Sequence, residues 1–538
     1  MRRESTSLLH EVSSGLSVFF ATLCIVDIFG VFPIIALPRA VVQCGFLGIP
    51  LVLTVFGLQI YTAALLGESW IIAADLDPQL LSKNRYPLAA VTEMTLGPIA
   101  RCIVTVLLDL TTFGGGIPNL LVASQNLQLF GYKISNEEFN LSYCYWLLLV
   151  SVLLCPFMWL GSPRDMKWLA VCSTISVILT AVLIWWCICT DERKLDVTRV
   201  PTSPSWDKFI SGYGMLAFQF DVHPTLMTIQ VDMRHPKSIK KAVGLAFLAS
   251  GCLFGVTAGL AVWKYEGSTT ANILQIVPTG FAVHTAILLA ALQLCFSSAI
   301  GHSALFQHLE DQFHVQRSFG WKRCTIRSAV VFLGVMVGES VPRFDIVMSL
   351  IGGTLTGPLV FVLPPLMYAR AQALKDNSNR LSMPNIYSKT TQLHSGSIGI
   401  SKNSKIHSTS IHYGFKDLVS AELSKQQHSC SRVYYNGFYP DECFIDNSNQ
   451  LEVGKEVSRD SPIIIDAADP SNNGQNMIEF PSKTRLLNDL RQKMNWFGYL
   501  IVLTGITITI SSTYINMRNT IRFVKFTPPC IVNATSTS

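Results

Sequence analysis

The chain has 538 residues, of which 49% are hydrophobic and only 14% are charged, and its mean hydropathy is +0.38. This composition lies far outside that of soluble domains and indicates a protein that crosses a membrane several times. The formal net charge of +6 requires no nucleic-acid partner, because membrane proteins concentrate Lys and Arg in their cytosolic loops. The fourteen cysteines contain no CxxC pair, which gives no sign of a metal site, and Cys187 or Cys189 could pair with Cys144.

The first apolar run, residues 15–48, is long enough to cross a bilayer, but Asp27, Gly30, Pro33 and Pro38 interrupt it. A continuous helix should therefore break within this run. Non-helical backbone at membrane depth survives only where protein or a water-filled cavity covers it. An interrupted span with a buried carboxylate thus predicts a binding site, and the alternative is a kinked structural helix with Asp27 near one end.

Apolar runs recur along the rest of the chain and are separated by polar loops. Because about 20 apolar residues cross a bilayer as a helix, these runs predict an all-α polytopic membrane protein. The eleven predicted spans lie at 15–48, 46–69, 99–123, 143–161, 167–190, 209–230, 242–263, 281–303, 326–341, 345–369 and 496–515. The N-terminal tail lacks the apolar core of a signal peptide, so we expect the first span to act as the insertion signal.

The distribution of Lys and Arg between loops predicts a cytosolic N-terminus. The polar stretch 371–488 is rich in Ser, Asn, Lys and Asp and has little apolar periodicity, so we expect a disordered cytosolic loop that could engage a cytosolic partner. The other predicted parts are a cytosolic tail (1–14), a ten-helix core (15–370, with repeats at about 15–190 and 209–369), a basic juxtamembrane segment with the eleventh helix (489–515) and an extracytosolic tail (516–538).

Three short motifs bear on where the protein resides. Asn140 and Asn533 each begin an Asn-X-Ser/Thr sequon on the predicted outer side, where oligosaccharide could be attached. Near the N-terminus, Glu4 precedes Leu8 and Leu9 in a pattern that resembles an acidic dileucine sorting signal, although such a short pattern also arises by chance. We therefore expect the plasma membrane or an endosomal, lysosomal or vesicular membrane.

The sixth span repeats the unusual composition of the first. Gly212, Gly214 and Pro224 interrupt it, and Asp221 and His223 lie at its middle. Two broken spans at corresponding positions of two five-helix halves are typical of secondary transporters with an inverted repeat and a site at the bilayer midplane. Each break frees backbone amides that can bind a carboxylate and carbonyls that can bind an ammonium group or a cation. The pair of breaks therefore predicts a site for a zwitterionic amino acid.

The candidate site residues follow from these two breaks and from the polar residues inside other spans. Those predicted to bind substrate are Asp27, Gly30, Val31, Phe32, Pro33, Tyr213, Phe218, Asp221 and His223. Those predicted to couple an ion, H⁺ or Na⁺, are Asp27, Asp109, Asp221, His223, Ser297 and Ser298. Asp109 could instead pair with a polar neighbour, and the two serines could simply make interhelical hydrogen bonds. No constellation of catalytic residues is present, so we predict that the chain is not an enzyme and needs no cofactor.

Several blocks in the same order resemble the amino acid/auxin permease family. The three clearest are ALPRAVVQCGFLG at 36–48, FQFDVHPTLMTIQVDMRHP at 218–236 and VPRFDIVMSLIGGTLTGPLVFVLPPL at 341–366. The resemblance implies a LeuT-like fold with a 5+5 inverted repeat and an eleventh transmembrane helix. It also implies secondary transport of amino acids driven by protons, or in some branches by sodium, as in the vesicular inhibitory and the vacuolar or proton-coupled transporters.

The first span departs from this family pattern. Val31-Phe32-Pro33 stands where relatives often have Gly-X-Gly, and Arg39 replaces the usual Tyr after Leu37-Pro38. These departures leave the substrate size and the coupling ion open. We predict a membrane transporter of small neutral amino acids, coupled to protons or alternatively to sodium. The alternative class is an amino-acid-sensing receptor that signals through its cytosolic loop.

Overall fold

The computed structural model divides the chain into two compact units, Pro384–Ile478 and the remainder. Only the remainder holds described residues, and both predicted sequons, the dileucine motif and most of 371–488 lie outside them. The structure describes residues 15–78, 86–135, 141–160, 164, 166–193, 199–200, 203–316, 319–382 and 490–523.

The described residues form helices and no strand, with one isolated bridge between Leu16 and Met233, and this confirms the all-α class. The helices are α2 (Val18–Phe29), α3 (Phe32–Gln43), α4 (Gly48–Leu76), α6 (Pro87–Leu96), α7 (Pro98–Ile134), α8 (Tyr143–Met158), α9 (Lys167–Cys189), α10 (Trp206–Gln219), α11 (His223–Asp232), α12 (Ile239–Tyr265), α13 (Ile273–Ile276), α14 (Phe281–Gly301), α15 (Ser303–Gln312), α16 (Trp321–Ser340), α17 (Phe344–Ile351), α18 (Leu363–Ser382) and α21 (Trp496–Phe523). Two π-helical turns, η4 (Gly352–Thr356) and η5 (Pro358–Val362), join α17 to α18.

Within the described residues, seven helices are long and apolar enough to cross a membrane, and an eighth span is present if α2 and α3 count as one. This confirms the polytopic class. Three predicted spans do not meet the same test: α8 has only 16 residues, α10 and α11 are separate short helices, and α16 begins with the charged residues Lys322, Arg323 and Arg327. The number of eleven spans therefore stays a prediction.

Two further expectations differ from the structure. Helix α18 continues to Ser382, so the beginning of 371–488 is helical rather than disordered. Asp376 on this helical extension forms an ion pair with Lys493, which lies just before α21. The ion pair connects the end of α18 to the segment that leads into α21. Cys187 and Cys189 are free thiols, so neither pairs with the disulfide-bonded Cys144.

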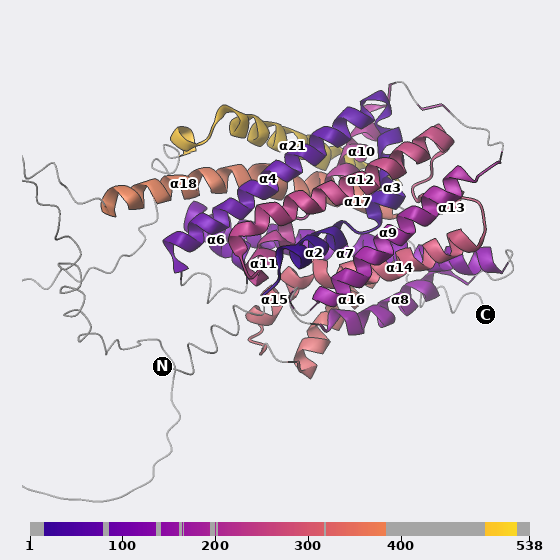
Figure 1. Ribbon diagram of the computed structural model, residues 1–538, viewed down its shortest axis with the longest axis horizontal. Helices are drawn as coiled ribbons and strands as arrows, with labels where there is room; N and C mark the ends of the chain where they lie inside the picture. The colour runs from indigo at the N-terminus through magenta and orange to yellow at the C-terminus, as the bar shows by residue number, and fades with distance from the viewer. Residues whose placement is uncertain are drawn as a thin grey trace, which may run out of the picture. The chain divides into compact units, whose positions relative to one another are not determined.

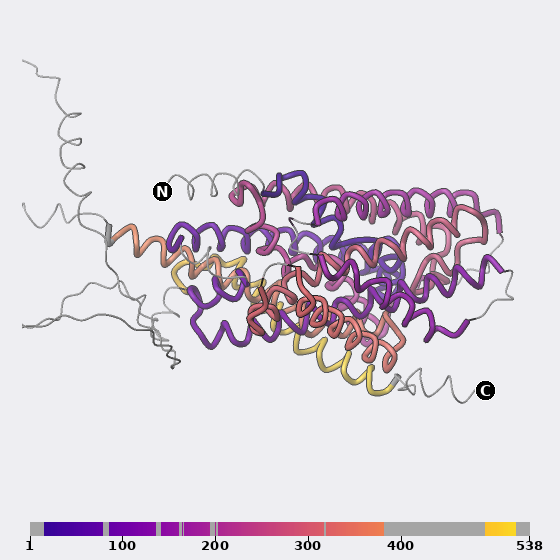
Figure 2. The backbone as a smooth tube through the Cα atoms, turned by 90° about the horizontal axis from the view of Figure 1, so that it is seen from below, coloured from indigo at the N-terminus to yellow at the C-terminus, as the bar shows by residue number. Residues whose placement is uncertain are grey.

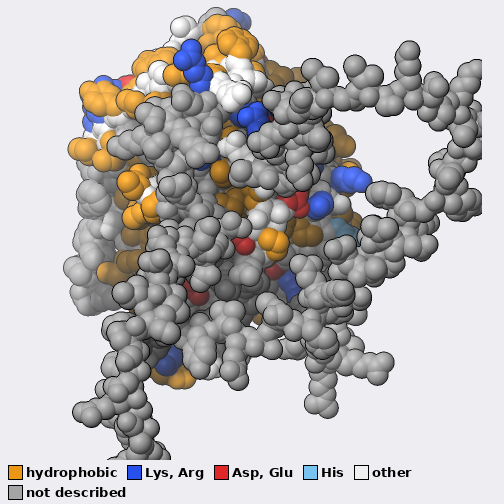
Figure 3. Space-filling model, turned by 90° about the vertical axis from the view of Figure 1, so that its left-hand side faces the viewer, with side chains coloured by type: hydrophobic (Ala, Val, Ile, Leu, Met, Phe, Trp, Pro, Cys, Tyr) orange, Lys and Arg blue, Asp and Glu red, His pale blue; other side chains and the backbone are white. Residues whose placement is uncertain are grey.

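The long helices lie roughly side by side, with α2 among α9, α12 and α14 (Figures 1 and 2). The end of this unit where α18 extends outward shows Lys and Arg side chains among hydrophobic ones (Figure 3). Lys237, just before α12, and Lys240, in its first turn, form ion pairs with Asp75 and Glu68 in the last turns of α4.

The predicted break in the first span is present, and α2 and α3 are bent by 49°. Gly30 has φ +61°, a backbone conformation that glycine adopts without steric cost. Val31 follows with its amide donating to Gln293 Oε1 at 3.0 Å, and Pro33 occupies the first turn of α3, where its missing N–H costs nothing. The sequence thus breaks the helix at Gly30 and restarts it at Phe32.

The sixth span breaks between Gln219 and His223. The Asp221 carboxylate accepts a hydrogen bond from the backbone amide of His223 at 3.1 Å and so caps the first turn of α11. The prediction that Gly212 and Gly214 interrupt this span is wrong, because both lie inside α10. Gly214 instead allows close packing, since a Cβ there would lie 2.4 Å from the carbonyl oxygen of Ser349 on α17.

At the opposite ends of the helices, Asp191 follows α9 and joins this segment to the end of α12. Its two carboxylate oxygens accept hydrogen bonds from Arg193 Nε at 2.9 Å and Nη2 at 2.8 Å, and Tyr265 donates its hydroxyl at 3.0 Å. Asp191 is almost completely buried, with 3% of its surface exposed. The hydrogen bonds from Arg193 are the main reason that the pKa of Asp191 falls from 3.8 to about 2.

This network predicts a specific loss of stability in acid. Because the folded pKa lies below the unfolded one, the ionised Asp191 stabilises the fold above about pH 4, and this contribution is lost as the pH falls towards 2. We expect Asp191→Asn to lower the free energy of unfolding by about 1–2 kcal/mol at neutral pH and by much less near pH 2. Melting temperatures of the purified protein at several pH values test this, and an equal effect at every pH would contradict it.

Candidate functional site

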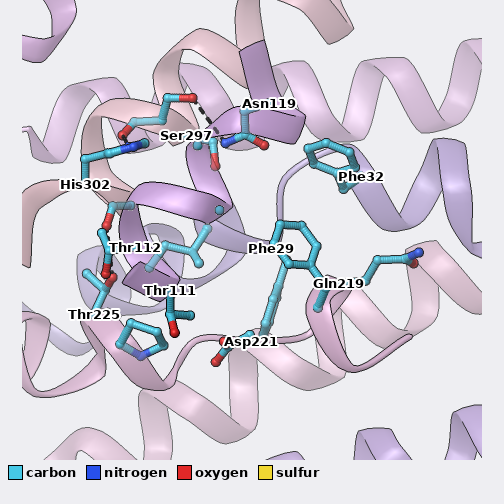
Figure 4. A pocket seen from close by; sticks show the side chains of 17 residues that line it. Phe29, Phe32, Thr111, Thr112, Asn119, Gln219, Asp221, Thr225, Ser297 and His302 are labelled. Carbon is cyan, nitrogen blue, oxygen red and sulfur yellow. Dashed lines mark hydrogen bonds between the residues drawn. The ribbon is translucent and has the colours of Figure 1, made fainter. Parts of the chain in front are cut away.

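A cavity of about 90 Å³ lies between the two broken spans (Figure 4). This volume corresponds to about three water molecules at liquid density. Residues from both breaks and from α7 and α14 enclose it. The lining consists of Ile28, Phe29, Phe32, Thr111, Thr112, Gly115, Gly116, Asn119, Phe218, Gln219, Asp221, Pro224, Thr225, Ser297, Ser298, Gly301 and His302.

Asp221 is the single carboxylate among these lining residues and is held rigidly. One carboxylate oxygen accepts from the His223 amide, and the other accepts from the hydroxyl of Thr356 in η4 at 3.1 Å. An ionised carboxylate has about four lone-pair positions, so both oxygens can accept further hydrogen bonds. Asp221 can therefore bind an ammonium group or another donor in the cavity without losing its role as the cap of α11.

Neutral polar groups lie across the cavity from Asp221. Figure 4 shows two of them there, Asn119 on α7 and His302 at the end of α14. Asn119 donates to the Ser298 hydroxyl at 3.1 Å, and His302 Nδ1 lies 2.7 Å from the Ser298 carbonyl oxygen. The Thr112 hydroxyl is buried and has no hydrogen-bond partner among the described residues. A buried hydroxyl without a partner is costly, so a ligand or water that bonds to Thr112 would be stabilised here.

Aromatic and glycine residues limit the size of the cavity. The rings of Phe32 and Phe218 meet edge to face with centroids 6.1 Å apart, so one aromatic side chain from each broken span closes the same wall. On α7, a Cβ at Gly116 would lie 2.1 Å from Cε1 of His302. These two close contacts therefore bound the cavity on the sides of the aromatic pair and of α7.

Asp27, which the sequence predicts as a substrate ligand, lies outside this lining. It is completely buried, and its carboxylate accepts hydrogen bonds from Ser173 on α9 and from Gln293 on α14. Its second carboxylate oxygen has no partner among the described residues. Asp27 therefore connects α2 to two neighbouring helices at the height of the break instead of contacting the cavity.

Gln293 is the residue that holds this break in place. It accepts from the Val31 amide at 3.0 Å, and its own amide nitrogen lies 3.3 Å from the Asp27 carbonyl oxygen and 3.1 Å from Ser173 Oγ. Ser297, one turn further along α14, donates to the same Asp27 carbonyl at 2.7 Å and also lines the cavity. Ser297 is thus a direct link between the Asp27 network and the cavity.

The other predicted site residues divide into two groups. Phe32, Phe218, Asp221, Ser297 and Ser298 line the cavity. The lining does not include Gly30, Val31, Pro33, Tyr213 or His223. Phe32 and Pro33 are consecutive residues of α3, so their side chains point in different directions and only Phe32 reaches the cavity.

His223 and Asp109 are not in the cavity lining and have partners of their own. His223 Nε2 lies 3.0 Å from the Thr62 hydroxyl on α4, and its Nδ1 lies 3.5 Å from Oδ1 of the lining residue Asp221. Asp109 accepts from the Tyr86 hydroxyl at 2.9 Å, and its other oxygen lies 2.9 Å from His308 Nδ1. For Asp109 the structure thus agrees with the alternative of pairing with polar neighbours.

Sequence reasoning missed six polar residues at the cavity or the break. The available signal was their position inside apolar runs, which we used only for charged residues, histidines and serines. They are Thr111, Thr112, Asn119, Gln219, Thr225 and Gln293.

A polytopic helical membrane protein with a small cavity between two broken spans has the architecture of a membrane transporter. The family model described as "Transmembrane amino acid transporter protein" matches residues 14–391, and the chain belongs to this family. This confirms the resemblance to the amino acid/auxin permease family. It also confirms that the chain belongs with transporters and not with enzymes.

Curated relatives are similar to the chain at low identity. Amino acid transporter AVT1C of Arabidopsis thaliana is 24% identical over 374 residues, which are 67% of this chain and 63% of the relative. The vesicular inhibitory amino acid transporter of Homo sapiens is 22% identical over 362 residues, or 63% of this chain and 66% of the relative. The matches thus span less than two thirds of the length of these relatives.

Among solved structures, a manganese transporter of Eremococcus coleocola aligns over 93% of this chain and 95% of its own. The sequence identity is 11% and the TM-score is 0.42, which is too low to establish a shared fold.

Proposed function

We propose that this protein is a secondary active transporter that moves small neutral amino acids across a membrane by alternating access. The observation that carries the proposal is the cavity enclosed by both broken spans, with Asp221 at one end and neutral polar groups at the other. The LeuT-like arrangement of two five-helix repeats and an eleventh helix is part of this proposal. Family membership supports amino acids as the substrate class.

The chemistry of the lining favours a zwitterion with a small side chain. Asp221 can accept from the ammonium group, while the Thr112 hydroxyl and the Asn119 amide can donate to a carboxylate. Neither Lys nor Arg is among the described residues that line the cavity, so an anionic side chain would lack a fixed countercharge. The 90 Å³ volume favours glycine or alanine over larger amino acids.

We propose protons as the coupling ion and Asp27 as the residue that carries the proton. A completely buried carboxyl group with one unpartnered oxygen changes its interactions strongly between its charged and neutral forms. Its neighbours Ser173 and Gln293 lie on helices that pack against the first span, so this change acts on the break and, through Ser297, on the cavity. Sodium is the alternative coupling ion.

The names of relatives support an internal membrane. One relative in Saccharomyces cerevisiae is named vacuolar amino acid transporter 3, and the human relative is named as vesicular. We therefore propose a vacuolar, lysosomal or vesicular location with the N-terminus in the cytosol.

Radiolabelled uptake into proteoliposomes tests this function. We expect glycine and alanine to enter about tenfold faster than phenylalanine, glutamate or lysine under an imposed proton gradient. Uptake driven only by a sodium gradient would overturn proton coupling but keep transport. No uptake of any amino acid under either gradient, by protein that is folded and inserted, would overturn the proposed function.

A further inference from the structure

A second recess, of about 640 Å³, lies on the flank of the bundle between α4 and α12. Its lining contains only hydrophobic residues and glycines, among which the Trp263 indole N–H and the Cys252 thiol are the only side-chain polar groups. The recess shares no lining residue with the cavity described above. It is therefore a separate feature with a separate chemistry.

The mouth of this recess lies on an apolar flank of the bundle. The helices that form it belong to two of the candidate membrane spans, and large apolar side chains on its rim are exposed, with Leu53 and Leu248 each at 66% and Trp263 at 71%. An apolar lining offers water no hydrogen-bond partner, so water does not fill the recess. Lipid is the medium that meets the apolar flank of a membrane span.

The floor of the recess is aromatic and fully buried. Phe220, Phe247 and Phe254 are each at most 2% exposed, and the Phe56 ring meets those of Phe220 and Phe247 with centroids 5.1 Å apart. The open volume above this floor comes from glycines on α12. A Cβ at Gly255 or Gly259 would meet nothing within 4 Å.

We propose that this recess is a lipid-binding groove that takes an acyl chain of a membrane phospholipid. Moving a chain from the bilayer into the groove gains little hydrophobic free energy, because both are apolar. The chain instead fills a void and gains van der Waals contacts with the aromatic floor that the empty groove lacks. A helix of a second copy is about 10 Å wide, so it would rest on the rim residues and leave the floor uncovered.

Occupancy of this groove has a direct route to the sixth-span break. Phe220 forms part of the floor and is the residue immediately before Asp221, which caps α11 and lines the cavity. A bound acyl chain supports the buried Phe220 from the lipid side. The groove does not depend on which substrate the cavity binds.

Photo-crosslinking tests the groove directly. The full chain is reconstituted in nanodiscs with a phospholipid that carries a photoactivatable group on its acyl chain, and the labelled peptides are identified by mass spectrometry. We expect labelling on α12 between Gly251 and Trp263 and on α4 between Ile49 and Phe56. The variant Gly255→Leu/Gly259→Leu fills the open volume and should lower this labelling by about fivefold or more.

Gly244→Leu is the matched control, because it adds the same side chain to α12 at a position with nothing within 4 Å that lies outside the groove. Its labelling should equal that of the unmodified protein. The single variant Gly259→Leu repeats the test with a smaller change, should the double variant fail to fold. Equal labelling of the groove variant and the control would overturn the proposal, and so would protein–protein crosslinks at the groove in place of lipid adducts.

Discussion

Replacing Asp27 with asparagine is expected to lower proton-driven amino acid uptake by about tenfold or more. The amide has nearly the same shape and can still bond to its neighbours Ser173 and Gln293 on the packed helices, but it cannot carry a proton. Two assays measure the effect. One follows uptake under an imposed pH gradient, and the other follows exchange of labelled for unlabelled substrate without a gradient. We expect the driven component to fall more than the exchange component, because Asp27 does not line the cavity.

Asp207→Asn provides the control for this prediction. Asp207 lies at the start of α10 and forms an exposed ion pair with Arg518, which contributes little to stability. This variant should retain the pH-driven uptake of the unmodified protein. Unchanged driven uptake in Asp27→Asn would show that the proton is carried elsewhere.

Replacing Gly116 with alanine should have the second large effect. The added methyl group would lie 2.1 Å and 2.2 Å from two atoms of the His302 ring. That ring cannot easily move away, because its Nδ1 lies 2.7 Å from the Ser298 carbonyl oxygen and it stacks on Phe306. We expect a loss of about 1–3 kcal/mol in stability and most of the uptake activity, measured by melting temperature and by uptake into proteoliposomes.

The neighbouring glycine offers a matched control on the same helix. A Cβ at Gly115 would lie 3.8 Å from the Phe218 ring, which is an ordinary van der Waals contact. We expect Gly115→Ala to be as stable as the unmodified protein. Because Gly115 lines the cavity, the added methyl group should make the variant prefer glycine over alanine as substrate. Equal behaviour of the two variants would contradict the tight contact between Gly116 and His302.

The sequence by itself determined the class of protein and the place where its first span breaks. Composition was enough for a polytopic helical membrane protein, and Gly30 with Pro33 was enough to locate the bend between α2 and α3. These features are local, because they depend on backbone conformations and on the hydrocarbon environment. Several blocks of similar residues, in the same order along the chain, were also enough to indicate the family.

Only the tertiary structure decided which side chains reach the cavity. Spans such as α4 and α14 are apolar on most of their surface, so the sequence carries no clear stripe to tell the side facing the cavity from the side facing lipid. Asp221 lines the cavity because it lies in a break, whereas Asp27 lies on a helix whose orientation is set by packing against α9 and α14. The role of Gln293 depends on atoms more than 200 positions away in the chain, and no local pattern specifies such a contact.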